Sequence, residues 1–499
     1  MSEQRFDAAQ VVADVARSYL LTPPRGDDAV VRHLAPDQLT AAFDPVIPIE
    51  LDAEVAAHTA DELRAAAELV VEYSVQTAHP RFVNQNFAGP DPVAVAGDWL
   101  GAALNTTGAT YEAAPVFTLM EDALLRKLGR VAGYPVADDM GAVAPGMFAP
   151  GGSSATLYAL QLARHRLEPD SVRKGATGER LVIFVSASGH YAAVKSAALL
   201  GIGMDNVVKV AVDEEGAMLA DELAREIESV RSAGATPLAV IATAGTTVTS
   251  AFDPLPAIAS ICEADNIWLH VDGCWGGSAL FSPAERDRLV GVERSDSFVW
   301  NLHKMMGLTQ QCTVLLVRDP EQLGPCFATG ADYLFQPDKL HGELDSGDRH
   351  FQCARRVDAL KLWLTWQAYG DAGFAQRVDH AVAMADHVRA RIAASGEEFA
   401  AIVAGDFTNV VFMWVPPELR PFDLAGLTPN QRAQLDALAP RTKARMQRAG
   451  SVLIGCQPVH GINAFRFILM NSTVEPGDVD AVLEDIARSS AVEWSQNGQ

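Results

Sequence analysis

The stretch Ser297-Phe-Val-Trp-Asn-Leu-His-Lys-Met-Met-Gly307 is the most informative part of this sequence. It is an apolar run in which Lys304 directly follows His303, and the chain has only eight lysines among its 499 residues. Burial disfavours the charged form of a lysine, so an amine in such a run is suited to attack a carbonyl carbon. A single lysine in an apolar segment is more often a surface residue whose ammonium group reaches water. The stretch therefore needs support from the rest of the chain.

A second stretch, Trp268-Leu-His-Val-Asp-Gly-Cys-Trp-Gly-Gly277, lies shortly upstream. It has the pattern of an apolar strand that ends in Asp272 and is followed by glycines. An aspartate at the end of a strand usually caps a helix or a turn. A lysine that forms a Schiff base and an acid that pairs with a pyridinium nitrogen are, however, what a protein needs to use pyridoxal phosphate (PLP). Lys304 and Asp272 together predict a PLP site, which neither residue predicts alone.

Short runs of β-branched residues alternate with helical segments through the middle of the chain. The predicted strands are Leu181–Val185, Val207–Val212, Pro237–Ala242, Ile267–Val271 and Thr313–Val317. The predicted helices between them include Leu219–Ser232 and Leu255–Ala264. This alternation is typical of an α/β domain with a mainly parallel sheet and helices on both of its faces.

Three regions are predicted along the chain. Residues 1–110 form an N-terminal helical segment, residues 111–370 form the large α/β domain, and residues 371–499 form a smaller α+β domain. Pro115–Val131 is expected to be a helix, because proline favours the first helical turn and Gly-Tyr-Pro follows its end. The last region is expected to contain helices at Asp379–Ala394, Gln431–Gly450 and about 477–489, and strands at Val410–Val415 and Phe465–Met470.

Composition narrows the class of protein. Apolar residues make up 49% and charged residues 20% of the chain, as in ordinary folded enzymes. The formal net charge of -24 argues against nucleic acid or an anionic membrane as partner, because phosphate binding needs a basic surface. The six cysteines form no CxxC pair, so no metal site is predicted. Because the sequence shows neither an apolar leader nor an apolar run of about eighteen residues, we expect a cytoplasmic protein.

Further residues suit the needs of PLP. Gly152 and Ser153 lie in a Gly-Ser loop before a helix predicted at Leu157–Arg166, where backbone N–H groups and hydroxyls bind phosphate. His190 follows a strand and has a flat ring that can stack on a pyridine. Thr246 follows another strand and offers a hydroxyl. Each has a simpler interpretation, since such a loop is often only a helix cap and such a histidine is often a surface residue.

These motifs, in this order, resemble the group II PLP-dependent amino-acid decarboxylases of fold type I. Within that group the chain is similar to the glutamate and cysteine sulfinate decarboxylases, from about residue 45 to about residue 490. The stretches that carry the similarity are His79–Gln85, Asn105–Phe117, Trp300–Gly307, Tyr333–Gln336, Arg355–Trp363 and Asn463–Arg466.

The resemblance implies a seven-stranded sheet and a role for each residue of the site. Lys304 would form the Schiff base, Asp272 would pair with the pyridinium nitrogen, and His190 would stack on the ring. Gln85 and Arg466 would hold substrate carboxylates, a task that suits the bidentate guanidinium group. The residues expected to contact the phosphate and other oxygens of PLP are Gly152, Ser153, Thr246 and His303. The resemblance also implies a homodimer with its active sites at the subunit interface.

Two positions depart from the family pattern. Relatives usually carry alanine two residues after the aspartate, whereas this chain has Cys274, whose thiol would lie against the ring face opposite His190. Relatives also carry a tyrosine in the loop after Asp338, thought to protonate the substrate carbon, and this chain has His341 there instead. Histidine exchanges protons near neutral pH, so His341 is a candidate replacement, and a simple polar turn is the competing interpretation. Without an acid here, oxidative deamination to an aldehyde becomes the alternative outcome.

The predicted substrate is a small acidic L-amino acid. Phe87 and Thr107 look closer to the aspartate and cysteine sulfinate decarboxylases than to glutamate decarboxylase. A bulky Phe87 would shorten the pocket, and Ala109, where relatives carry an aromatic residue, would widen it. We expect α-decarboxylation of aspartate or cysteine sulfinate, with glutamate next and a non-acidic amino acid as a further alternative.

Other classes fit less well. A nucleotide-dependent oxidoreductase would carry G-x-G-x-x-G after a strand, and a serine hydrolase would carry G-x-S-x-G; the sequence has neither. An inactive protein of the same fold is disfavoured because Lys304, Asp272, His190 and Arg466 are all present.

Overall fold

The computed structural model describes residues 2–51, 55, 57–139, 141–176, 178–331 and 338–497. The chain divides into two compact units. The larger comprises Pro90–Ala383 and Val403–Asn409, and the smaller comprises Met1–Gly89, Met384–Ile402 and Val410–Gln499. The N-terminal helices therefore share a unit with the C-terminal residues, and the functional division expected near residues 110 and 370 remains a prediction.

The larger unit is built on a seven-stranded sheet with the order β2-β8-β7-β6-β5-β3-β4. Its strands are β2 (Gly146–Ala149), β3 (Leu181–Ser186), β4 (Val207–Val210), β5 (Thr236–Thr243), β6 (Trp268–Asp272), β7 (Ser297–Asn301) and β8 (Thr313–Val317). The run from β4 through β3, β5 and β6 to β7 is parallel, and β8 is antiparallel to both of its neighbours. The predicted mainly parallel, seven-stranded sheet is confirmed.

The direction of β8 follows from its short connection to β7. Only antiparallel neighbours can be joined by a short loop, whereas parallel neighbours need a long crossover. The chain turns back between Asn301 and Thr313, which lie opposite each other in the two strands. Lys304 lies in this connection, at the carboxyl end of β7.

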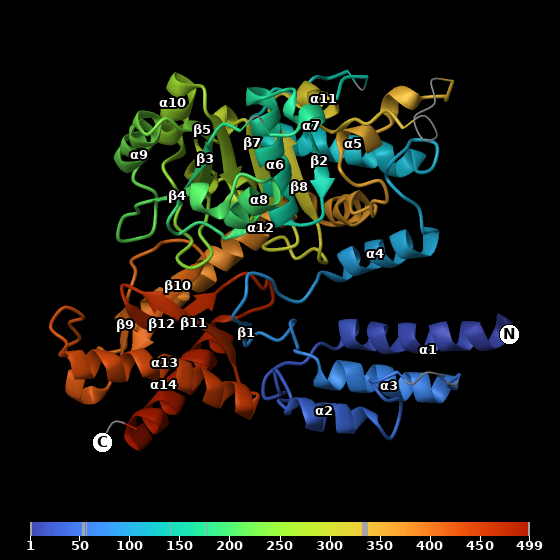
Figure 1. Ribbon diagram of the computed structural model, residues 1–499. Helices are drawn as coiled ribbons and strands as arrows, with labels where there is room; N and C mark the ends of the chain where they lie inside the picture. The colour runs from blue at the N-terminus through green and yellow to red at the C-terminus, as the bar shows by residue number, and fades with distance from the viewer. Residues whose placement is uncertain are drawn as a thin grey trace. The chain divides into compact units, whose positions relative to one another are not determined.

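Helices cover both faces of the sheet (Figure 1). They are α5 (Pro115–Val131), α6 (Gly152–Leu167), α7 (Ser171–Lys174), α8 (Ala192–Leu199), α9 (Ala220–Ser232), α10 (Leu255–Asp265) and α11 (Leu323–Phe327). Helices α6 and α8 share one hydrophobic core with Ile183 and Val185 of β3, and α9 and α10 contact β5. Every residue of β3 and β7 is buried, which is why these strands are almost continuously apolar in sequence.

Two more helices of the larger unit cross closely. They are α4 (Pro92–Leu104) and the first part of α12 (Ala359–Ala393), a long helix interrupted by non-helical backbone at Gly370. A Cβ atom on Gly97 of α4 would lie 2.7 Å from the Cα of Lys361, so the crossing requires glycine there. The sequence predicted only the C-terminal part of α12, from Asp379.

The smaller unit contains a five-stranded sheet with the order β1-β11-β12-β10-β9. Its strands are β1 (Phe82–Val83), β9 (Phe399–Ala401), β10 (Asn409–Trp414), β11 (Leu453–Val459) and β12 (Ile462–Ile468). Its helices are α1 (Ser2–Leu21), α2 (Pro36–Phe43), α3 (Ala60–Tyr73), α13 (Pro429–Ala449) and α14 (Pro476–Asn497), and the chain of α12 continues into this unit. The α+β character predicted for the C-terminal region is thus found in this unit.

Strand β11, which was not predicted from the sequence, forms a hairpin with β12. His460 and Gly461 form its two-residue turn with positive φ angles of 50° and 74°, the conformation that tight hairpins favour. Gly455 and Pro458 inside β11 are unfavourable in strands and hid it from pattern recognition. The strand predicted from Phe465 begins instead at Ile462, directly after the turn.

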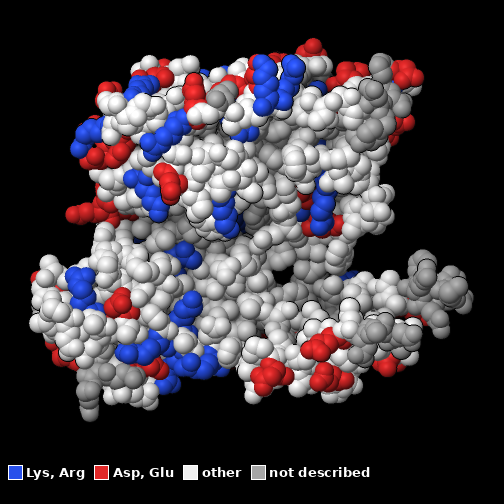
Figure 2. Space-filling model, in the orientation of Figure 1, with Lys and Arg blue, Asp and Glu red and all other residues white. Residues whose placement is uncertain are grey.

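The charged surface is mixed. On the face drawn in Figure 2, basic and acidic side chains of the larger unit are interspersed. Within the described residues, no helix is long and apolar enough to span a membrane, and no group of three or more His, Cys, Asp or Glu has metal-binding geometry.

Candidate functional site

The predicted site residues of the larger unit gather at the carboxyl edge of its sheet. His190 follows β3, Asp272 ends β6 and Lys304 follows β7. The register pairs Asp272 with Thr243 of β5 on one side and with Val299 of β7 on the other. This edge is where open α/β sheets bind ligands, because the loops after parallel strands converge there.

Asp272 is an almost completely buried anion. Its residue is 8% exposed, and its Oδ1 accepts the backbone N–H of Cys274 at 3.0 Å. Burial by itself raises the pKa of a carboxyl, but hydrogen bonds from Cys274 and the positive charge of Lys304 outweigh it and hold the pKa of Asp272 below its ordinary value. Asp272 is therefore ionised at neutral pH, as pairing with a protonated pyridine requires.

Lys304 lies in a tight turn. Its N–H donates to the carbonyl of Asn301 at 3.2 Å, and its carbonyl accepts the N–H of Gly307 at 3.0 Å. The charge of Lys304 influences the pKa values of both Asp272 and His190, so the three side chains share one electrostatic environment. The structure thus brings together the amine, the acid and the flat ring.

His190 is half-buried and neutral. Burial lowers its pKa, with the charge of Asp272 opposing this effect and that of Lys304 adding to it. Its Nδ1 accepts the N–H of Ala192 at 3.2 Å, which leaves the proton on Nε2. Its ring lies 4.0 Å from that of Tyr191, at an interplanar angle of 34°.

The start of α6 forms a cradle that only glycine fits. The helix begins at Gly152, earlier than predicted, so Gly152 and the exposed Ser153 lie in its first turn. A Cβ atom on Gly152 would lie 2.5 Å from the Sγ of Cys274 and 3.0 Å from the Nδ2 of Asn301. The open N–H groups of a long helix attract phosphate, and the helix start lies beside the segment that follows Asp272. These residues fit the phosphate and ring of PLP.

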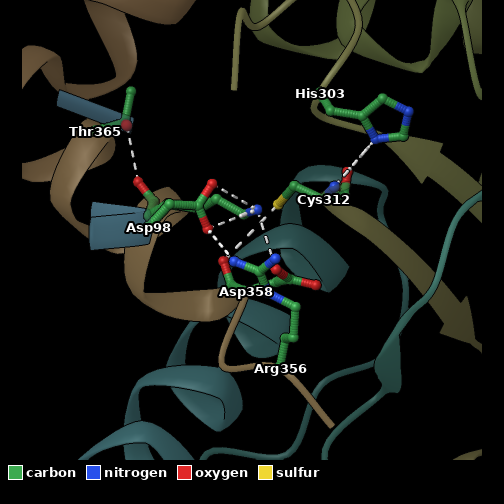
Figure 3. Close-up of polar contacts among 7 residues, drawn as sticks. Asp98, His303, Cys312, Arg356, Asp358 and Thr365 are labelled. Atoms are coloured by element: carbon green, nitrogen blue, oxygen red, sulfur yellow. Dashed lines mark hydrogen bonds and ion pairs between the residues drawn. The ribbon is translucent and has the colours of Figure 1, made fainter. Parts of the chain in front are cut away.

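His303 is held by the backbone of the next strand. Its Nδ1 lies 3.1 Å from the nitrogen and 3.0 Å from the oxygen of Cys312, and Figure 3 shows its ring directed at that residue. Burial lowers the pKa of His303 to about 4, against a weaker opposing effect of the Cys312 hydrogen bond. His303 is therefore neutral, and only its Nε2 is left for a ligand.

Thr246 and Thr107 are occupied by other contacts. Thr246 is fully buried, and its Oγ1 lies 2.7 Å from the Oγ1 of Thr249 and accepts the N–H of Ala251 at 3.0 Å. The hydroxyl of Thr107 donates to the carbonyl of Cys353 at 3.2 Å and accepts the N–H of Arg355 at 3.0 Å. Both hydroxyls stabilise the chain around them.

Thr243 was not predicted as a site residue from the sequence. It ends β5 next to Asp272, and its buried Oγ1 finds no hydrogen-bond partner among the described residues. A Cβ on Gly189 would lie 3.6 Å from this oxygen, so Thr243 faces the loop that carries His190. Its position directly after the predicted strand Pro237–Ala242 was the available signal.

His341 lies on an exposed turn with left-handed backbone, φ 60°. Its Nδ1 is 3.5 Å from a carboxylate oxygen of Glu343, and its ring meets the edge of Tyr111 at 5.3 Å. The predicted motif Tyr333–Gln336, shortly before it, lies outside the described residues.

The predicted substrate residues of the smaller unit lie near one another. Arg466 of β12 donates to the carbonyl of Asn84 at 2.7 Å, next to the exposed Gln85. Burial lowers the pKa of Arg466 to about 10, which still leaves it charged at neutral pH. Phe87 packs 5.4 Å from the ring of Phe82, against the small hydrophobic cluster that includes Leu453.

Comparison with known proteins agrees with this geometry. The pyridoxal-dependent decarboxylase conserved domain matches residues 43–415. Human cysteine sulfinic acid decarboxylase is 44% identical over 424 residues, 84% of each chain, and human acidic amino acid decarboxylase GADL1 is 42% identical over 425 residues, 84% of this chain and 79% of the relative. The crystal structure of mouse CSAD has a TM-score of 0.90 and 37% identity, covering 97% of this chain and 98% of that chain.

The resemblance noted in the sequence is therefore confirmed, together with the fold type and the cofactor. The family match extends over most of the chain and includes Lys304, Asp272, His190 and Gly152. The chain belongs to the pyridoxal-dependent decarboxylase family and is a PLP-dependent amino-acid decarboxylase.

Proposed function

We propose that this enzyme removes the α-carboxyl group of a small acidic L-amino acid, with aspartate or cysteine sulfinate preferred over glutamate, to give the amine and CO2. The observation that supports the use of PLP is the ionised Asp272 at the same sheet edge as Lys304, and the match to the pyridoxal-dependent decarboxylase domain supports decarboxylation. The acidic substrate class is supported by the half-buried, charged Arg466 and by relatives named for cysteine sulfinic acid and acidic amino acids.

The chain would hold PLP through the residues of this edge. Bound PLP supplies a protonated pyridine ring that accepts the electron pair left by CO2. The carboxylate of Asp272 would keep the proton on the pyridine nitrogen, and His190 would orient the ring by stacking. The N–H groups at Gly152 and Ser153 would bind the phosphate, helped by the Nε2 of His303, and the thiol of Cys274 would lie against the ring face opposite His190.

The remaining roles concern protons and the substrate. Lys304 would hold PLP through its amine, which would replace the aldehyde oxygen with release of water, and its Nζ would take up and return protons as substrate enters and product leaves. Arg466 and Gln85 bind substrate carboxylates, Phe87 limits the length of the side chain accepted, and Thr107 is a further residue of the substrate pocket. His341 supplies the proton that the substrate carbon needs after CO2 has left.

A second candidate function is oxidative deamination to an aldehyde. The observation behind it is the exposed position of His341, which contacts Tyr111 and Glu343. If His341 does not deliver a proton, the carbon remains open to reaction with oxygen.

We also propose that the enzyme acts as a homodimer with active sites at the subunit interface. Large apolar side chains are exposed on two helices of the larger unit, which is typical of protein contact surfaces. They are Trp99, Leu100 and Leu104 of α4 and Val116 and Leu119 of α5. A cytoplasmic location remains a prediction from the sequence.

The decisive experiment offers the PLP-loaded enzyme aspartate, cysteine sulfinate, glutamate and an aromatic amino acid separately. CO2, amine and aldehyde are each quantified. We expect CO2 and amine in equal amounts from aspartate or cysteine sulfinate. Turnover of only the aromatic amino acid would refute the acidic substrate, and aldehyde in place of amine would establish the second candidate function.

A further inference from the structure

The turn that carries Lys304 is hydrogen-bonded to two residues that form an ion pair with each other, Asp91 and Arg377. Arg377 of α12 donates from Nη1 to the carbonyl of Met306 at 2.6 Å, and the backbone N–H of Asp91 donates to the carbonyl of Gly307 at 2.8 Å. Arg377 and Asp91 also bind each other, because Arg377 Nη2 donates to Asp91 Oδ2 at 2.6 Å. All of these residues belong to the larger unit.

Both members of the pair are fixed in place. The side chains of Arg377 and Asp91 are 12% and 8% exposed. Asp91 also caps α4, since its Oδ1 accepts the N–H of Val93 at 2.8 Å. Gly307 has a φ angle of 70°, and a Cβ there would lie 2.8 Å from Arg377 Nη1, so the arginine approaches as closely as a glycine allows. An ion pair that is mostly shielded from water, with each member also hydrogen-bonded to the backbone, gives a rigid support.

We propose that Asp91 and Arg377 are positioning residues for Lys304: they hold the Met306 and Gly307 carbonyls so that the lysine amine meets the PLP aldehyde. Lysine has a flexible four-carbon stem, so the position of its backbone is what the fold can control. Gly307 connects this support to the lysine, because the N–H of Gly307 donates to the backbone carbonyl of Lys304. Small displacements of a reacting group are costly in rate. This inference rests on the proposed role of Lys304.

The competing explanation is that the pair only ties α4 to α12. The chain contains a matched control for that explanation, the ion pair between Asp98 of α4 and Lys361 of α12, with 3.2 Å between Oδ1 and Nζ. Lys361 also lies 3.0 Å from Asp358 and is 1% exposed, and Figure 3 shows Asp98 and Asp358 in this cluster. Its links to the Lys304 loop are indirect: the thiol of Cys312 lies 3.9 Å from the carbonyl of Asp358, and, in addition to burial, the charge of Lys361 contributes to lowering the pKa of His303.

The test compares Arg377→Lys and Arg377→Leu with Lys361→Arg and Lys361→Met. Two properties of the apoprotein are measured without substrate. One is the rate at which Lys304 captures added PLP, trapped with borohydride and located by mass spectrometry. The other is the rate at which acetic anhydride acylates Lys304, read from the same peptide. Thermal unfolding of each variant reports the loss of helix–helix attachment.

We expect Arg377→Leu to slow PLP capture about tenfold or more and Arg377→Lys to have a smaller effect, with neither Lys361 variant slowing capture more than about twofold. All four variants are expected to lower the unfolding temperature, because each disturbs an ion pair between α4 and α12. Equal capture rates in the Arg377 and Lys361 variants of similar stability would overturn the proposal. If Arg377→Leu does not fold, the comparison of Arg377→Lys with Lys361→Arg decides. Failure of the unaltered protein to capture PLP at Lys304 would instead overturn the proposed function.

Discussion

Gly152 and Cys274 approach so closely that a single added carbon on the glycine would lie 2.5 Å from the sulfur. The contact joins the first turn of α6 to the segment after β6. The residues proposed to bind the phosphate and those proposed to bind the ring are therefore packed directly against each other.

Gly152→Ala should weaken PLP binding. The added methyl must displace Cys274 or the start of α6, and overpacking of this kind costs about 1–3 kcal/mol, which corresponds to about fivefold to a hundredfold or more in affinity if the whole cost falls on the bound state. Titration of the apoprotein with PLP measures the effect. Gly324→Ala is the control, since a Cβ there meets nothing within 4 Å. Adding Cys274→Ala should restore part of the affinity, and an unchanged affinity in Gly152→Ala would contradict the cradle.

Cys274→Ala should shift the acid side of the pH–activity profile to higher pH. Hydrogen bonds from Cys274 help to hold the pKa of Asp272 below its ordinary value, so losing the thiol raises that pKa. Because the ionised form is the active one, activity present above this pKa is lost as the pH falls through it, and the loss then begins earlier. The profile of kcat against pH measures the shift. The exposed Cys353 provides the control variant Cys353→Ala, and coincident profiles for all three enzymes would refute the coupling.

Arg466→Lys should reduce kcat/KM for the acidic substrate. Lysine keeps the charge but loses the bidentate geometry, and hydrogen bonds to charged groups contribute about 1.5–3 kcal/mol, or about ten- to a hundredfold in rate. Steady-state kinetics with aspartate and with cysteine sulfinate give the numbers. Equal losses with an amino acid that lacks a side-chain carboxylate would assign Arg466 to the α-carboxylate or to folding.

His341→Ala should change the products as well as the rate. General acids typically contribute about a hundredfold or more, so amine formation falls and the share of aldehyde rises. The ratio of aldehyde to CO2 is the measurement. Glu343→Gln serves as control because it keeps the imidazole and removes only its carboxylate neighbour at 3.5 Å. A constant ratio in His341→Ala would show that the proton comes from elsewhere.

Much of the larger unit could be predicted because its strands are buried on both faces. Asp272 and Lys304 stood out for the same reason, since each polar residue interrupts or follows an apolar strand. The strand β11 could not be predicted, because Gly455 and Pro458 are tolerated only through its pairing with β12. The occupied hydroxyl of Thr246 and the open one of Thr243 also escaped prediction, because the sequence does not show which of two nearby threonines bonds to its own loop.

The antiparallel β8 has a consequence for the order of folding. Asp272, His190 and Gly152 reach the sheet edge only when segments far apart in sequence have paired. Lys304 lies instead between two strands that are neighbours in both sequence and space, with Asn301 opposite Thr313. Contacts between residues close in sequence form fast, because little chain entropy is lost in closing the loop. The connection that carries Lys304 is therefore expected to form early, whereas its support by Asp91 and Arg377 and the pairing of the parallel strands, which bring together residues far apart in sequence, come later.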